Sequence, residues 1–287
     1  MITIASAPCR ISLFGGGTDT TNNGLVINLA INLRTKVLLH TQDDIWSIEN
    51  SVPYNASREL YHAILSHFGL GSMHHAKFVS ITDANVGEGL GTSASAGVAL
   101  IKAIDKTVGL NLTRVQIAEK AFEIESSLWN TGRQDVYASA FGGMNIFEFK
   151  DKVKVYSVER EIAENIKKHL FLYYIGGVRQ PQIKSLTNLD KIRMIAEEAK
   201  SNLKYPEYLG ELLNMSWQEK KKSNPNVSNE RIDAIYSKAL EAGVWGGKVL
   251  GSGGAGYMAF MAPEKPKLDL EEIDFEISWD GVEGRIL

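Results

Sequence analysis

Glycines gather in three short segments of the chain, where the backbone could turn tightly or lie close to a ligand. Twelve of the 26 glycines fall within residues 15–17, 87–91 and 246–256. Glycine weakens a helix or strand by roughly 0.5–1 kcal/mol relative to alanine, so dense clusters usually mark tight turns or a close approach to a ligand. Each cluster taken alone is compatible with a plain turn. The predicted elements around a cluster must therefore show whether it forms a turn or a ligand site.

The second cluster has the context of an anion-binding site. A strand is predicted over 77–82, and apolar residues at helical spacing predict a helix over 94–108. The glycine-rich sequence between them, Gly87-Glu-Gly-Leu-Gly-Thr-Ser-Ala-Ser95, ends at the N-terminus of that helix. Free backbone N–H groups and the positive end of the helix dipole meet at this point, so the segment is suited to bind a phosphate.

Two carboxylates follow that segment. Glu125 lies in the apolar stripe of a helix that begins with the capping box Thr113-Arg-Val-Gln116 and runs to about Leu128. A carboxylate on a buried face needs a cation, a metal or a hydrogen-bond network, unless its side chain reaches solvent at the edge of the stripe. Asp135 precedes a short predicted helix over 136–141, which it could simply cap.

The remaining pattern predicts an α+β protein with a domain boundary near residue 160, giving domains 1–160 and 161–287. The further elements expected before the boundary are strands 2–5, 10–14, 25–33 and 35–40, a helix over 57–68, and a hairpin of strands 145–149 and 153–158. After the boundary we expect helix 161–169, strand 170–175, helices 188–202, 206–222 and 228–242, and strands 275–279 and 282–287.

Several function classes are disfavoured. Gly251-Ser-Gly-Gly-Ala-Gly256 fits a dinucleotide-binding pattern, but a strand-like run follows it where a helix is required, so a glycine-rich hairpin is favoured. The sequence contains no P-loop motif and no G-x-S-x-G, and its six histidines lack metal-ligand spacing. These observations argue against a dehydrogenase, a P-loop enzyme, a serine hydrolase and a zinc enzyme.

Composition and charge limit the classes of partner that the protein could bind and the compartment in which it could act. The hydrophobic fraction of 44% suits a globular protein with a sizeable core, and a net charge of −3 gives no electrostatic footprint for nucleic acid. Cys9 is the single cysteine, and no apolar run is long enough for a signal peptide or a membrane span. We therefore expect a cytoplasmic protein that binds neither nucleic acid nor membrane; its oligomeric state stays open.

Four segments in this order resemble the GHMP small-molecule kinases. Three are Ala7-Pro-Cys-Arg-Ile-Ser-Leu-Phe-Gly-Gly-Gly-Thr-Asp19, the Gly87–Ser95 loop, and Lys248-Val-Leu-Gly-Ser-Gly-Gly-Ala-Gly-Tyr257; the fourth is 132–143, which is similar to the segment holding the family's catalytic aspartate. The resemblance covers nearly the whole chain. It implies a two-domain fold, with an N-terminal half like ribosomal S5 domain 2 and a ferredoxin-like C-terminal half.

The resemblance also implies ATP and Mg²⁺ as cofactors and assigns residues to them. Asp135 would be the catalytic aspartate, and Arg10 would either lower the pKa of Asp135 or stabilise the transferring charge. Ser93 and Glu125 would hold Mg²⁺. The residues implied to bind ATP are Gly87, Gly89, Leu90, Gly91, Thr92, Ser93, Ala94 and Ser95.

The implied substrate is a sugar. The form Gly15-Gly-Gly-Thr-Asp19 is similar to D-glycero-D-manno-heptose 7-phosphate kinases, which phosphorylate an anomeric hydroxyl, whereas galactokinases usually carry acidic and histidine side chains at Gly16 and Gly17. A kinase for fucose, galactose or a mevalonate-type alcohol, and a catalytically silent relative, are the alternatives. The residues implied to bind the substrate are Gly16, Gly17, Thr18, Asp19, Arg179, Gly253 and Gly254.

Overall fold

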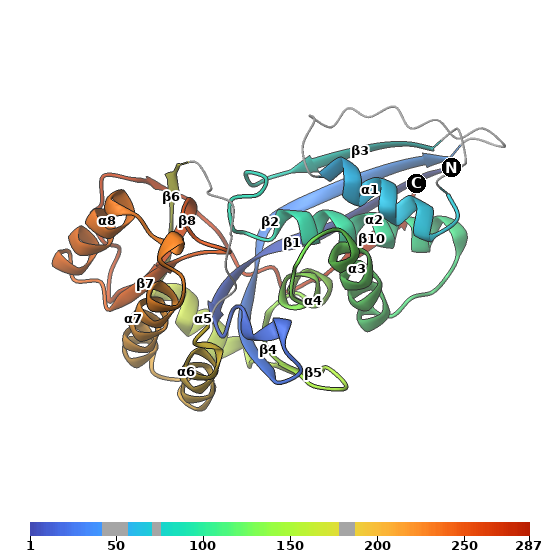
Figure 1. Ribbon diagram of the computed structural model, residues 1–287. Helices are drawn as coiled ribbons and strands as arrows, with labels where there is room; N and C mark the ends of the chain where they lie inside the picture. Colours follow the sequence, from blue (N-terminus) through green and yellow to red (C-terminus); the bar gives the residue numbers. More distant parts are fainter. Residues whose placement is uncertain (42–56, 71–75, 178–186) are drawn as a thin grey trace.

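Two antiparallel sheets with helices packed against them make up the protein, so the α+β class is confirmed (Figure 1). The computed structural model describes residues 1–41, 57–70, 76–177 and 187–287. Within these residues the first sheet has the strand order β10-β1-β2-β4-β5, with β3 also paired to β2. The second sheet has the order β7-β8-β6-β9.

The first sheet is built on two long strands, β1 (Ile2–Phe14) and β2 (Gly24–Thr41). The prediction of four short strands here is wrong, because strands 2–5 and 10–14 are one strand and strands 25–33 and 35–40 are another. The pairing of β1 with β2 shifts register between Pro8 and Cys9. Proline cannot donate to the ladder, and a bulge lets the strand continue past it.

Helices cover one face of the first sheet. The chain order is α1 (Ser57–His67), β3 (Ala76–Thr82), α2 (Thr92–Val108), α3 (Arg114–Leu128), α4 (Gln134–Phe141), β4 (Met144–Phe149) and β5 (Lys154–Ser157). The apolar stripe of α2 is fully buried against β2, as Leu100 and Ile104 share a core with Val37 and Leu39. The capping box predicted for α3 is present, with Thr113 accepting from the backbone of Gln116.

The strands of the second sheet and the C-terminal helices follow in the chain. In chain order these elements are α5 (Arg160–Lys168), β6 (Leu170–Gly176), α6 (Leu189–Ser201), α7 (Pro206–Ser223), α8 (Glu230–Glu241), β7 (Gly246–Val249), β8 (Gly256–Met261) and β9 (Glu271–Glu272). Short 3₁₀ turns occur at Thr18–Thr20 and Pro225–Val227. Strands β7 and β8 are antiparallel neighbours, which confirms the glycine-rich hairpin. No helix among the described residues is both long enough and apolar enough to cross a membrane.

The last residues return to the first sheet. The predicted strand 275–279 is wrong, because only Ile277 forms a bridge there, to Ile31 of β2. The guanidinium of Arg34, on β2, donates to Ser278 Oγ and to the carbonyl oxygens of Asp280 and Gly281, which holds the residues before β10 against β2. Strand β10 (Glu283–Ile286) then pairs with β1. Residues 283–286 therefore lie on the first sheet, whereas β6 to β9 form the second.

Candidate active site

Arg10 of β1 and Asp135 of α4 form an ion pair with two hydrogen bonds. Arg10 Nε lies 2.7 Å from Asp135 Oδ1, and Nη2 lies 2.5 Å from Oδ2. Arg10 Nη1 also donates to the carbonyl oxygen of Gly89, at 2.5 Å. Asp135 does not cap α4, because the helix begins after Arg133 and Asp135 lies in its first turn. Its side chain is 23% exposed, so the carboxylate is fixed on one side and open on the other.

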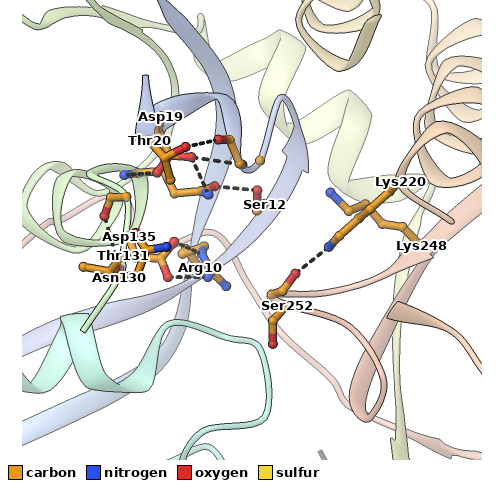
Figure 2. A pocket seen from close by; sticks show the side chains of 15 residues that line it. Arg10, Ser12, Asp19, Thr20, Asn130, Thr131, Asp135, Lys220, Lys248 and Ser252 are labelled. Atoms are coloured by element: carbon orange, nitrogen blue, oxygen red, sulfur yellow. Dashed lines mark hydrogen bonds and ion pairs between the residues drawn. The ribbon is translucent and has the colours of Figure 1, made fainter. Parts of the chain in front are cut away.

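Two cavities meet at this ion pair. The first cavity has a volume of about 210 Å³ and the second about 280 Å³. Figure 2 shows the first cavity, with Arg10 and Asp135 on one side and two lysines across from them. The residues that line both cavities are Arg10, Asn130, Thr131, Asp135, Gly251 and Ser252. Asp135 therefore faces both spaces, which is the arrangement needed between a group that is transferred and a group that accepts it.

The glycine-rich loop and the start of α2 line the second cavity. Gly89 has a φ of +105°, and a Cβ there would lie 2.7 Å from the carbonyl oxygen of Leu250. Gly91 precedes α2 and supplies no side chain to cap it. The first N–H groups of a helix have no partner within the helix, so they are available to an anion in the cavity. The predicted order of strand, glycine-rich loop and helix is confirmed, and anion binding there stays a prediction.

Glu125 lies on the buried face of α3, in the second cavity. The residue is 4% exposed, and its Oε1 accepts a hydrogen bond of 2.8 Å from Ser93 Oγ. The other oxygen, Oε2, is buried without a hydrogen-bond partner. Burial raises the pKa of Glu125 to about 7, and the Ser93 hydrogen bond acts in the opposite direction. A buried carboxylate oxygen without a partner is unfavourable, so this position suits a cation.

Asp19 fixes the start of α4. Its Oδ1 accepts from Gly17 N and Gln134 Nε2, and its Oδ2 accepts from Gln134 N, each at 3.0 Å. Ser12 Oγ donates to Gln134 Oε1 at 2.7 Å, which joins β1 to this network. Burial raises the pKa of Asp19 to about 6, against the effect of the Gln134 backbone donor. Since Gln134 precedes Asp135, this network positions the Asp135 carboxylate.

The structure brings most of the predicted site residues together. The predicted residues that line one or both cavities are Arg10, Gly16, Gly17, Asp19, Gly87, Gly89, Gly91, Thr92, Ser93, Glu125 and Asp135.

Six predicted residues do not line either cavity. Thr18 Oγ1 donates to the carbonyl oxygens of Gly15 and Leu25, so its hydroxyl holds the turn. Leu90 is buried, and its carbonyl accepts from Arg10 N. The others are Ala94 and Ser95, which are buried in α2, and Gly253 and Gly254, which lie against Val227 and Asn226. Arg179 lies outside the described residues.

Several residues that line the cavities were not predicted from the sequence. The residues concerned are Ser12, Thr20, Trp129, Asn130, Thr131, Gly132, Gln134, Lys220, Lys248, Gly251 and Ser252. Lys248 and Gly251 lie inside the third glycine-rich motif, so the motif itself could have indicated them. For Lys220, which lies in the last turn of α7, only the fold shows that its side chain reaches the cavity.

Comparison with known proteins agrees with the four motifs. Residues 55–143 match the family described as GHMP kinases N terminal domain, and residues 199–274 match GHMP kinases C terminal. A D-glycero-alpha-D-manno-heptose 7-phosphate kinase of Campylobacter jejuni is 28% identical over 306 residues, covering 92% of this chain and 90% of that protein. A mevalonate kinase of Archaeoglobus fulgidus is 28% identical over 277 residues, covering 92% and 94%.

A solved structure shows the same likeness over the full length. The crystal structure of a D-glycero-D-manno-heptose 1-phosphate kinase from Bacteriodes thetaiotaomicron has a TM-score of 0.75 and 26% sequence identity, and the match covers 99% of each chain. The likeness therefore includes both sheets and their helices, and with them the elements that carry the two cavities.

Proposed function

The chain belongs to the GHMP kinase family and is a phosphotransferase, and we propose that it transfers the terminal phosphoryl group of ATP to a hydroxyl group of a sugar. One observation carries this proposal. The Asp135 carboxylate, held by Arg10, lies on the wall common to the two cavities. Phosphoryl transfer depends mainly on positioning and on electrostatic stabilisation, and this pair is placed to supply both at the boundary.

The second cavity is the proposed site for the ATP phosphates. The N–H groups at the start of α2 and the backbone of the glycine loop would bind the phosphate oxygens. Residues Ser93 and Glu125 fit Mg²⁺, because the free oxygen Oε2 of Glu125 and the hydroxyl of Ser93 are hard oxygen ligands at the edge of this loop. Magnesium commonly takes only one or two protein carboxylates and completes its shell with phosphates and water, and when bound it would offset charge on the phosphates.

The first cavity is the proposed site for the acceptor. Asp135 would accept the proton of the attacking hydroxyl or orient that hydroxyl toward the phosphorus atom. Arg10 would hold Asp135 through its Nε and Nη2 atoms, while its charge stabilises negative charge that develops on the transferred group. Asp19 would act through Gln134, by fixing the first turn of α4.

For the acceptor itself, we favour the anomeric hydroxyl of D-glycero-D-manno-heptose 7-phosphate. The Gly15-Gly-Gly-Thr-Asp19 motif and the heptose 7-phosphate kinase relative at 28% identity support this choice. The mevalonate kinase relative has the same identity, so a mevalonate-type alcohol is the second candidate.

A panel of acceptors tests the proposal. Release of ADP from ATP and Mg²⁺ is measured with the heptose 7-phosphate, mannose, fucose, galactose and mevalonate, and the product is analysed by ³¹P NMR. We expect turnover on the heptose 7-phosphate and a new anomeric phosphate signal. Turnover on mevalonate alone would replace the sugar with the second candidate, and turnover on no acceptor would refute the proposal.

A further inference from the structure

Two lysines face the Asp19 and Asp135 side of the first cavity from the C-terminal half of the chain (Figure 2). Lys248 belongs to β7, and Lys220 lies in the last turn of α7. Both line the first cavity, and neither is among the residues that line the second. An anion bound by them therefore lies on the acceptor side of the Arg10–Asp135 pair, away from the glycine loop.

Lys248 is a buried cation with little compensation. It is 4% exposed, and its Nζ donates to the carbonyl oxygen of Leu13 at 3.2 Å. An ammonium group has three N–H donors, so this contact leaves two for a ligand. Among the residues that the structure describes, no carboxylate lies within ion-pair distance of Lys248. Burial, and then the charges of Lys220 and Arg10, lower the pKa of Lys248 well below its ordinary value.

The two acidic side chains of the first cavity are held by other groups. Arg10 and Asp135 pair with each other, and the oxygens of Asp19 already accept hydrogen bonds from Gly17 and Gln134. Lys220 Nζ donates to the carbonyl oxygen of Gly251 at 2.6 Å, which holds its charge at the cavity wall. A buried charge needs a partner, and an anion bound here would supply one to Lys248.

We propose that Lys248 and Lys220 form a subsite for an anionic group of the acceptor substrate, a phosphate monoester that is separate from the phosphoryl group transferred. Two ammonium groups match the double negative charge of a phosphate monoester better than the single charge of a carboxylate. This inference rests on the proposed function, since it assumes that the acceptor occupies the first cavity. The subsite would favour the binding of phosphorylated sugars over that of neutral sugars.

Charge removal at constant side-chain length tests the subsite. The variants are Lys248→Met and Lys220→Met, and the matched control is Lys221→Met, because Lys221 on the same helix pairs with Asp233 at 3.0 Å and lines neither cavity. Steady-state kinetics compare the heptose 7-phosphate with the same heptose lacking phosphate. For Lys248→Met we expect KM for the phosphorylated acceptor to rise about 10- to 100-fold, with kcat/KM for the neutral heptose and KM for ATP within threefold of wild type. Lys220→Met should show a smaller rise, and Lys221→Met none.

A binding measurement separates this inference from the proposed function. Inorganic phosphate is titrated into each protein without nucleotide, and the shift in thermal unfolding temperature is recorded. We expect the protection by phosphate to be weaker in Lys248→Met than in wild type and Lys221→Met. If this difference appears but no acceptor turns over, the proposed function fails and the anion subsite stands. Equal protection in all proteins, or an equal loss of kcat/KM on phosphorylated and neutral heptose, would overturn the subsite.

Discussion

Arg10 and Asp135, 125 positions apart in the sequence, meet through two hydrogen bonds of 2.7 and 2.5 Å. Both residues line the first cavity and the second. Arg10 is 3% exposed and also binds the Gly89 carbonyl, so one guanidinium joins the aspartate to the glycine loop. Under the proposed function, this contact would fix the position of Asp135 relative to the glycine loop.

The planar guanidinium geometry of Arg10 should contribute to activity as well as its positive charge. Arg10→Met is expected to lower kcat about 10²- to 10³-fold, by analogy with the loss of one preorganised donor. Arg10→Lys keeps a positive charge but cannot make both bonds to Asp135, so it should recover only part of the activity. Steady-state kinetics with saturating ATP check this, and circular dichroism checks the fold. Activity of Arg10→Met within threefold of wild type would contradict the role.

Glu125 should set the magnesium requirement. Glu125→Gln removes the charge at the buried oxygen that has no protein partner, so the Mg²⁺ concentration for half-maximal activity is expected to rise about 10- to 100-fold. Glu123→Gln is the matched control, because Glu123 is exposed on the same helix. A titration of activity with Mg²⁺ at fixed ATP measures the effect; an unchanged midpoint in Glu125→Gln would exclude the carboxylate as a ligand.

The same carboxyl group should affect stability in a pH-dependent way. Its pKa of about 7 in the folded protein exceeds the ordinary value of 4.5, so between these values the folded state holds a proton that the unfolded chain has lost. The free energy of unfolding therefore falls as the pH rises from about 4.5 to 7, by up to about 3 kcal/mol. Without Mg²⁺, Glu125→Gln should be more stable than wild type at pH 8 by up to that amount, and the difference should shrink at pH 5. Urea unfolding at both pH values tests this, and a difference independent of pH would contradict it.

Gly89 should be more sensitive to substitution than Gly87. Both have positive φ, but a Cβ at Gly89 would lie 2.7 Å from the Leu250 carbonyl oxygen, whereas a Cβ at Gly87 would meet open space. We expect Gly89→Ala to lower the free energy of unfolding by about 2–3 kcal/mol and to raise KM for ATP. The cost of a positive φ for alanine and the clash of its Cβ with Leu250 would both contribute. Gly87→Ala should cost about 1 kcal/mol. Thermal unfolding and ATP titration measure both, and equal effects would argue against the close approach of the loop to Leu250.

Asp19 should act as a positioning residue. Asp19→Asn replaces an acceptor with an amide nitrogen that faces donors from Gly17 and Gln134, so the first turn of α4 loses support. The expected result is a fall in kcat of about 10- to 100-fold, together with a lower unfolding temperature, while KM for ATP changes little. An unchanged unfolding temperature with a large rise in KM for the acceptor would instead mean that Asp19 contacts the substrate directly.

The sequence alone predicted those features that depend on local pattern. Helical spacing placed Glu125 on a buried face, and the glycine loop before α2 was evident from the strand and helix around it. The pairing of Arg10 with Asp135 has no local signal, and only the family resemblance indicated it. For Thr18 the family resemblance implied a substrate contact, but in the structure its hydroxyl donates to the Gly15 carbonyl and holds a turn.

Long-range geometry explains what the sequence could not predict. Lys220 and Lys248 come from a helix and a strand that only the tertiary structure brings to one cavity. The residues around Pro8 interrupt the strand pattern, yet a register shift lets β1 run through them. The final strand pairs with β1 of the first sheet, and Arg34 holds the residues just before it; no spacing in the sequence indicates either contact.

We propose above all that Asp135 promotes phosphoryl transfer from ATP to a sugar hydroxyl. The most direct measurement is release of ADP with ATP, Mg²⁺ and the heptose 7-phosphate, for wild type and Asp135→Asn. We expect acceptor-dependent turnover in wild type, a fall of about 10²- to 10⁴-fold in Asp135→Asn, and unchanged ATP binding. Acceptor-dependent turnover in Asp135→Asn at the rate of wild type would contradict it.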